Sequence, residues 1–155
     1  MWLKFAVALL IVAVSVFVGY LSAGKYRLRK SYFQAFQSFN EKFLAELCYT
    51  RRALAEFIQK ERKEGDFYHM ANCALVERDS VRKPSYLSED EYEYLMEYFH
   101  AVGRADAKTQ TGWFATRKGE LERSCKEAEA EAKNRGELYL KLGLLSGLAI
   151  VILIV

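Results

Sequence analysis

The sequence has few of the residues from which metal sites and disulfide frameworks are built. Its 155 residues include only three cysteines and two histidines. The cysteines, Cys48, Cys73 and Cys125, are odd in number and lie far apart. No pair of them has the spacing of a zinc site, and the two histidines, His69 and His100, do not cluster with them. We interpret the cysteines as small apolar core residues of a reducing compartment, and we expect no metal and no cofactor.

The sequence also lacks the short motifs that carry catalysis. It contains no nucleophile elbow, phosphate-binding loop, metal-binding helix motif or dinucleotide fingerprint. Carboxylates are frequent in residues 89–97 and 120–131, but on helices they would face solvent. Acid–base catalysis needs carboxylates in a cleft with separated pKa values. We predict that the protein is not an enzyme, and a membrane-bound hydrolase is disfavoured because no nucleophile–base pair is visible.

No charge of one sign dominates. The sequence has 23 lysines and arginines and 20 acidic residues, for a net charge of +3. Because the two signs are interleaved, there is no concentrated basic face, and we expect no nucleic-acid binding. The acidic stretch at residues 120–131 is interpreted as a solvated helix face, with docking to a basic partner as the alternative.

Two long apolar runs lie at the ends of the sequence. The first, Phe5 to Ala23, has nineteen residues, about the number that a helix needs to cross a bilayer. The second begins at Leu138 and contains one lysine near its start, which can extend to the headgroups. At ~1.5 Å per residue it covers about 27 Å. We predict transmembrane helices at residues 1–24 and 138–155 and a helical domain at residues 25–137.

Basic residues next to these runs predict the orientation. They lie mainly on the side of the central domain, which positive-inside asymmetry places in the cytoplasm of a cell membrane. These residues are Lys25, Arg27, Arg29 and Lys30 after the first run and Lys133, Arg135 and Lys141 around the start of the second. The alternative is a signal peptide cleaved after Ala23, which would leave a secreted or membrane-tethered extracytoplasmic helical binding module.

The middle of the sequence has helical periodicity and no strand-like alternation. No proline or glycine interrupts residues 25–64, so one helix is predicted from Ser31 to about Lys63. A shorter helix is predicted after Gly65, followed by a loop at residues 81–88 that holds the single proline. Further expected elements are a helix opened by a capping box of Ser88 and Glu91, a turn at Gly103 to Asp106, and a last helix from Ala107. We predict an all-α, antiparallel helical bundle, in which the transmembrane helices continue the first and last bundle helices.

Small residues recur at intervals of four in both apolar runs. They are Ser15, Gly19 and Ala23 in the first and Gly143 and Gly147 in the second. In lipid, such residues let helices approach closely. We interpret them as packing positions, either between the two spans or against other membrane proteins.

Three stretches carry a resemblance to a known family. They are residues 139–150 (YLKLGLLSGLAI), residues 46–54 (ELCYTRRAL) and residues 103–110 (GRADAKTQ). Together they resemble stage III sporulation protein AB of endospore-forming Firmicutes, although the family's usual Thr-Pro-Leu in the second stretch is Arg52-Ala53-Leu54 here.

The resemblance implies a structural role at the mother-cell membrane. The family belongs to the channel apparatus between mother cell and forespore, and its helical domain resembles the platform protein of type II secretion and type IV pilus machines. The implied function is a non-enzymatic membrane platform, with a cytoplasmic ATPase and other stage III channel proteins as partners and homo-oligomerisation left open. The residues implied in bundle architecture or docking are Glu46, Tyr49, Gly103, Asp106 and Gln110.

The predicted orientation can be tested at Cys73. If the central domain is cytoplasmic, a membrane-impermeant thiol reagent should leave Cys73 unlabelled in intact cells, because the bilayer separates the two. The measurement is the labelling of Cys73 before and after permeabilisation. Ready labelling in intact cells would contradict the orientation.

Overall fold

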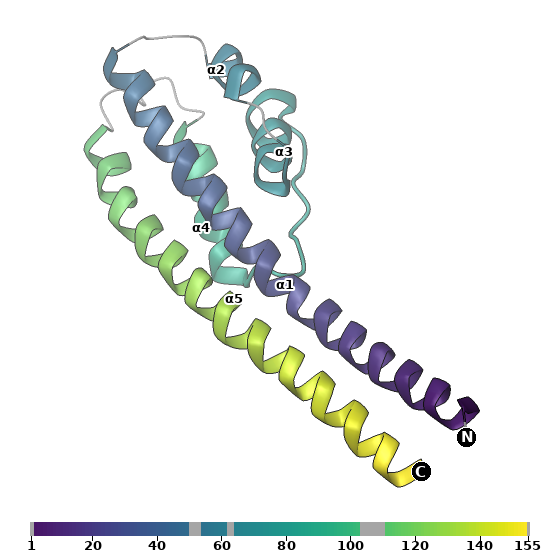
Figure 1. The fold of residues 1–155 in the computed structure, drawn as a ribbon. Coiled ribbons are helices and arrows are strands. Elements are labelled where there is room, and N and C mark those ends of the chain that lie inside the picture. The colour runs from purple at the N-terminus through teal and green to yellow at the C-terminus, as the bar shows by residue number, and fades with distance from the viewer. Residues whose placement is uncertain (1, 50–53, 62–63, 103–110, 155) are drawn as a thin grey trace. The chain divides into compact units, whose positions relative to one another are not determined.

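The structure is a computed structural model that describes residues 2–49, 54–61, 64–102 and 111–154 (Figure 1). In these ranges the chain forms α-helices and one short π-helix, with no strand, so the all-α prediction is confirmed. The elements are α1 (Trp2–Tyr49), α2 (Leu54–Glu61), α3 (Asp66–Asn72), η1 (Cys73–Glu77), α4 (Glu89–Val102) and α5 (Thr111–Ile154).

The helices form two compact units. The first, here the terminal unit, combines Met1–Leu28 with Ala128–Val155, and the second, the central unit, consists of Arg29–Glu127. The helices α1 and α5 contribute to both units, because each is continuous over its whole range. This confirms that the two apolar end segments continue the first and last helices of the bundle.

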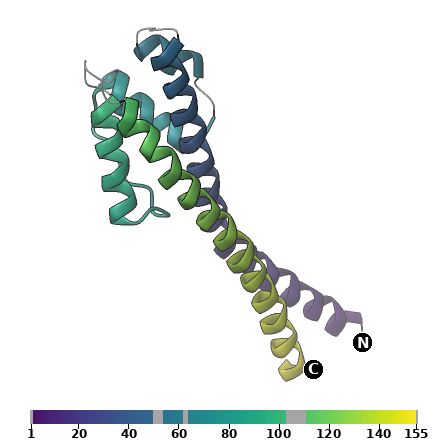
Figure 2. The ribbon, with the colours of Figure 1, turned by 90° about the vertical axis from the view of Figure 1, so that its left-hand side faces the viewer.

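Aromatic rings fill the core of the central unit. Phe36 and Phe39 of α1, Phe67 of α3, Tyr98 of α4 and Phe114 of α5 are all at most 1% exposed. The ring centroids of Phe36 and Tyr98 are 4.8 Å apart in an edge-to-face pair, and those of Phe36 and Phe67 are 5.0 Å apart and stacked. Such pairs stabilise beyond the area they bury. The aromatic residues therefore hold α4 against α1 and α5, as seen in Figures 1 and 2.

The helix predicted from Ser31 to about Lys63 is wrong in its second half. The chain forms two elements there, α1 to Tyr49 and α2 from Leu54. The ring centroid of Phe57 lies 5.5 Å from that of Phe39, whereas eighteen residues of one helix would separate the two residues by about 27 Å. The chain therefore reverses, and α2 packs on α1. The physical reason is burial: Phe57 and Ile58 are each 4% exposed in this arrangement, which a helix extending away from the core would not provide.

The segments between α2 and α4 follow the prediction more closely. A helix does begin after Gly65, whose φ of 138° favours glycine. It continues into η1 and ends at Arg78 with left-handed φ of 54°. The capping box is confirmed, since the Ser88 amide donates to Glu91 Oε2 at 2.9 Å and the Glu91 amide donates to Ser88 Oγ at 3.2 Å. The predicted turn at 103–106 and the predicted start of the last helix at 107 lie outside the described residues.

A buried amide connects three helices of the central unit. Asn40 in α1 is 1% exposed. Its Oδ1 accepts a hydrogen bond of 2.8 Å from the Tyr98 hydroxyl in α4, and its Nδ2 donates to the Phe114 carbonyl in α5 at 3.3 Å. Burial raises the pKa of Tyr98 well above its ordinary value, so the phenol stays a neutral donor.

Removing the Tyr98 hydroxyl tests this connection. The substitution Tyr98→Phe should lower the free energy of unfolding by about 1–3 kcal/mol, because it leaves the Asn40 oxygen without its donor in a dry core. The measurement is unfolding of the full chain in detergent, followed by circular dichroism. The matched control is Tyr86→Phe, whose acceptor Asp66 is exposed, so water can replace the phenol and the loss should be smaller. Equal losses for the two variants would contradict the role of the buried amide.

Candidate functional site

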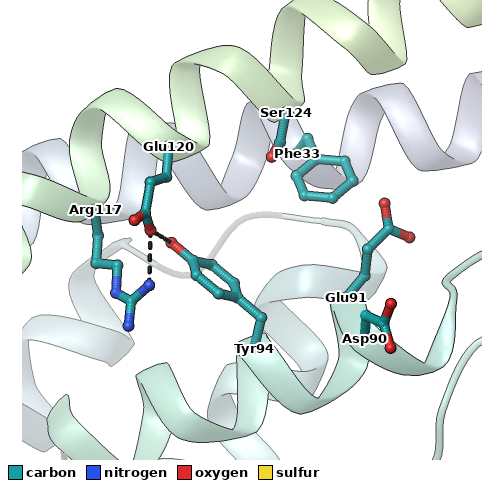
Figure 3. A pocket seen from close by; sticks show the side chains of 7 residues that line it. All are labelled: Phe33, Asp90, Glu91, Tyr94, Arg117, Glu120 and Ser124. Carbon is teal, nitrogen blue, oxygen red and sulfur yellow. Dashed lines mark hydrogen bonds and ion pairs between the residues drawn. The ribbon is translucent and has the colours of Figure 1, made fainter.

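The central unit has a surface pocket between α1, α4 and α5 (Figure 3). Its volume is about 400 Å³. An apolar floor is rimmed by charged side chains, and the lining residues are Phe33, Asp90, Glu91, Tyr94, Arg117, Glu120 and Ser124.

Arg117 is held in place on one side of this pocket. Its guanidinium lies 4.8 Å from the ring centroid of Tyr94 and 4.5 Å from that of Trp113. It also pairs with Glu120 at 2.7 Å and with Glu97 at 3.5 Å. The spacing of four between Trp113 and Arg117 and of three between Arg117 and Glu120 places all three on one helix face. The cation thus bridges α4 and α5 while its side chain remains only 19% exposed.

Tyr94 and Glu120 form a hydrogen-bonded pair beside this arginine (Figure 3). The phenol donates to Glu120 Oε2 at 3.1 Å. Burial, reinforced by Glu120, raises the pKa of Tyr94, while the hydrogen bond from Arg117 lowers the pKa of Glu120. At neutral pH the phenol is therefore protonated and the carboxylate charged. Neither group has a pKa near 7, so the pair suits binding rather than proton transfer.

Glu91 has two structural partners at the other end of the pocket. One carboxylate oxygen accepts hydrogen bonds from Arg29 at 3.0 Å and 2.5 Å, and the other accepts from the amide of Ser88. The side chains of Arg29 and Glu91 are only 22% and 19% exposed. The sequence indicated Glu91 as a capping residue, but it did not indicate Arg29 as its partner, because 62 residues separate them.

Of the residues implied in docking, Glu46 is described with its side chain, and it does not line this pocket. Glu46 is half-buried in α1, and Tyr49 is the last residue of that helix. Gly103, Asp106 and Gln110 lie outside the described residues. Their roles in architecture or partner contact stay predictions. The pocket residues Arg117 and Glu120 were not singled out from the sequence, although the spacing of Trp113, Arg117 and Glu120 on one face is a readable signal.

Small residues lie where α1 and α5 meet in the terminal unit. A β-carbon added at Gly19 would lie 2.6 Å from the carbonyl oxygen of Tyr139, and one at Gly143 would lie 2.7 Å from that of Ser15. At Gly147 it would lie 3.1 Å from the Cα of Val12. Since real β-carbons essentially never approach backbone below 3.0 Å, larger residues at Gly19 and Gly143 would push the helices apart. Ser15 is half-buried and Ala23 is 3% exposed.

The outer surface of the terminal unit is apolar. By length and composition, α1 and α5 each contain a segment that can cross a membrane. Large apolar side chains on both are well exposed, including Leu9 at 74%, Leu21 at 60%, Leu145 at 61% and Ile152 at 78%. A core helix of a soluble protein would bury such residues, whereas lipid can cover them.

The described residues contain no group of three or more histidine, cysteine or acidic side chains placed to hold a metal ion. Cys125 is buried and Cys73 is half-buried, and neither forms a disulfide. Burial raises the pKa of Cys73, and neighbouring Glu77 adds to this effect. The thiol is therefore protonated at neutral pH and a poor nucleophile.

Comparison with known proteins relates the second half of the chain to one family. The model of a family described as stage III sporulation protein AB matches residues 60–155. This range covers more than half of the chain and includes α3, α4 and α5, with Tyr94, Arg117 and the glycines of the second apolar segment. No curated protein and no solved structure matches the chain.

The close approach of the two helices in the terminal unit can be tested at Gly143. The substitution Gly143→Leu should lower the thermal stability of the full chain in mild detergent, because its side chain would collide with backbone at Ser15. The control is Gly136→Ala in the same helix, where an added β-carbon meets nothing within 4 Å. Alanine should leave stability unchanged or raise it, since glycine costs roughly 0.5–1 kcal/mol in a helix. If the two variants melt alike, the helices are not closely packed at Gly143.

Proposed function

Because this chain belongs to the stage III sporulation protein AB family and so has a role in stage III of sporulation, we propose that it is a non-enzymatic membrane platform subunit. It would act in the secretion-like channel complex between mother cell and forespore. The observation that carries the proposal is the family match over residues 60–155. This stretch includes one side of the pocket as well as the second apolar segment.

The polar surface of the central unit supports a binding role over a catalytic one. Three of its carboxylates are engaged in ion pairs and caps: Glu91 with Arg29 and Ser88, Glu61 with Lys42, and Glu120 with Arg117. A paired carboxylate holds its charge and stabilises the helices that it connects. It is poorly suited to exchange protons with a substrate.

The terminal unit supports anchoring through an uncleaved first span. Gly19 of α1 lies against Tyr139 and Gly143 of α5, and Ala23 is buried in the same unit. Cleavage after Ala23 would remove the residues against which Gly143 and Gly147 pack. The proposed location is therefore the mother-cell membrane, with both spans retained and the central unit in the cytoplasm. A mass measurement of the mature chain distinguishes this from the cleaved, extracytoplasmic binding module.

The proposed partners are a cytoplasmic ATPase and the other membrane subunits of the channel, with a further copy of this chain among the candidates. The surface proposed for docking comprises the pocket of the central unit, whose lining combines the ring of Phe33 with charged side chains, Asp90 among them. Glu46 and Tyr49 of α1, together with Gly103, Asp106 and Gln110, remain proposed contributors to architecture or docking.

Affinity purification from sporulating cells tests the platform role. A tagged full chain should co-purify a cytoplasmic ATPase and other membrane channel proteins. The double variant Tyr94→Ala with Arg117→Gln should reduce that recovery severalfold, because it removes the stacked, ion-paired side of the pocket.

The matched control is Arg123→Gln, which removes an arginine from an 82% exposed position on the same helix. It should leave recovery unchanged, since exposed i,i+4 pairs contribute little. Purification of the wild-type chain without any ATPase or channel protein would contradict the platform role. Undiminished recovery with the double variant would instead exclude the pocket as the docking surface.

A further inference from the structure

Most described cations have a carboxylate partner. In the central unit, Arg29, Lys42, Lys83, Arg117, Lys118, Arg123 and Lys126 each form an ion pair. In the terminal unit, Arg135 pairs with Glu131 and Lys141 with Glu137. These cations are locally compensated, so they attract an external anion weakly.

Lys25 and Arg27, like Lys60, Arg78 and Arg82, have no ion pair with another described residue, but they contact aromatic rings instead. The guanidinium of Arg27 lies 3.9 Å from the ring centroid of Tyr20 and donates a hydrogen bond of 3.0 Å to the Tyr20 carbonyl. The ammonium of Lys25 lies 4.9 Å from the ring centroid of Tyr26. Both cations are exposed, and within the described part of the chain neither has a carboxylate partner. Aromatic rings orient them without neutralising them.

Their position along α1 is at the edge of the apolar surface. Tyr20 is 50% exposed and Leu21 is 60% exposed, and both lie just before the two cations in the sequence. Tyr26 stacks on Tyr139 of α5 with centroids 5.9 Å apart. Tyrosines with this placement are typical of the membrane–water interface, where the apolar ring body and the hydroxyl are both satisfied. The two cations therefore lie at headgroup level if the apolar segments span a bilayer.

A further cation without an ion-pair partner lies on α5. Lys133 of α5 is exposed and has no ion-pair partner among the described residues. It lies six residues before Tyr139, which is about 9 Å along the helix. Since Tyr139 stacks on Tyr26, Lys133 lies about 9 Å along the helix from the level of Lys25 and Arg27 and is not counted in the site.

We propose that Arg27, stacked on Tyr20, binds the headgroup phosphate of an anionic phospholipid, and that Lys25, on another face of the same helix, adds local positive charge; this rests on the proposed membrane insertion. Arg27 has five N–H donors, of which one contacts the Tyr20 carbonyl, so others remain for phosphate oxygens. Stacking on Tyr20 restrains the arginine before the lipid arrives, which lowers the entropy lost on binding. Leu21, which is exposed on the membrane side of the two cations, offers apolar surface to the acyl chains. An anionic lipid is favoured over a zwitterionic one, because no carboxylate at the site would hold a choline group.

Lipid binding to the detergent-solubilised full chain tests this site. The probes are short-chain phosphatidylglycerol, short-chain phosphatidylcholine and inorganic phosphate, with bound lipid counted by native mass spectrometry. The wild-type chain should bind phosphatidylglycerol more tightly than phosphatidylcholine. Each of Lys25→Gln and Arg27→Gln should weaken phosphatidylglycerol binding by about fivefold, the factor expected for one interfacial cation.

Two control variants test whether lipid binding depends on these particular cations or only on the total positive charge of the protein. Arg123→Gln with Lys126→Gln removes the same two charges from carboxylate-paired positions and should leave lipid binding unchanged. Arg27→Lys retains the charge but loses the planar fork and its stacking, so it should bind phosphatidylglycerol more weakly than the wild type. Equal loss in the paired-charge variant, or full binding by Arg27→Lys, would overturn the proposal.

The remaining outcomes test two further points. One is whether the site binds a lipid headgroup or any free anion, and the other is whether the chain inserts into a membrane at all. If inorganic phosphate binds as tightly as phosphatidylglycerol, or if both lipids bind equally, the lipid-headgroup assignment is wrong. Flotation of the full chain with phosphatidylcholine vesicles is measured in parallel. Failure to float would overturn membrane insertion and this site with it. Flotation without any preference for phosphatidylglycerol would overturn the site alone.

Discussion

The amide of Asn40 connects three helices, accepting from Tyr98 in α4 and donating to the carbonyl of Phe114 in α5. It does so inside an aromatic core, where an unsatisfied polar atom would be costly. Contacts between apolar rings can persist when one helix slides or rotates against another. The two hydrogen bonds of Asn40 form at only one relative position of the three helices. The arrangement of α1, α4 and α5 therefore depends on this side chain, and so does the pocket that those helices line.

Electrostatic partners divide the surface into two kinds of region. In the central unit, ion pairs such as Arg29 with Glu91 and Arg117 with Glu120 join helices far apart in sequence or stiffen one helix face. At the edge of the apolar surface, Lys25 and Arg27 contact tyrosine rings instead. Compensated charges stabilise the fold, while ring-held charges remain available to an anion. This difference is the basis on which we propose a lipid site at Arg27 rather than at the ion-paired surface charges.

Local patterns allowed much of the fold to be predicted. Length and apolarity identified the two end segments, and the spacing of Ser88 and Glu91 identified the start of α4, since a capping box needs only four consecutive residues. The same reasoning failed between Tyr49 and Leu54, because it relied on proline and glycine to mark a helix end. The reversal is favoured by the burial of Phe57 against Phe39 and Phe43, and no local pattern encodes that contact.

The candidate pocket shows the same limit. Arg117 and Glu120 are near neighbours in sequence, but Tyr94 and Phe33 join them only through packing of α4 and α1. What the sequence by itself determined is the all-helical class, the two apolar ends and the small residues at intervals of four. Periodicity and composition act over a few turns, so they can be read from neighbouring residues. The tertiary structure alone decided the return of α2, the role of Asn40 and the ion pairs between helices, such as Arg29 with Glu91. Those depend on atoms brought together from residues as many as 74 positions apart.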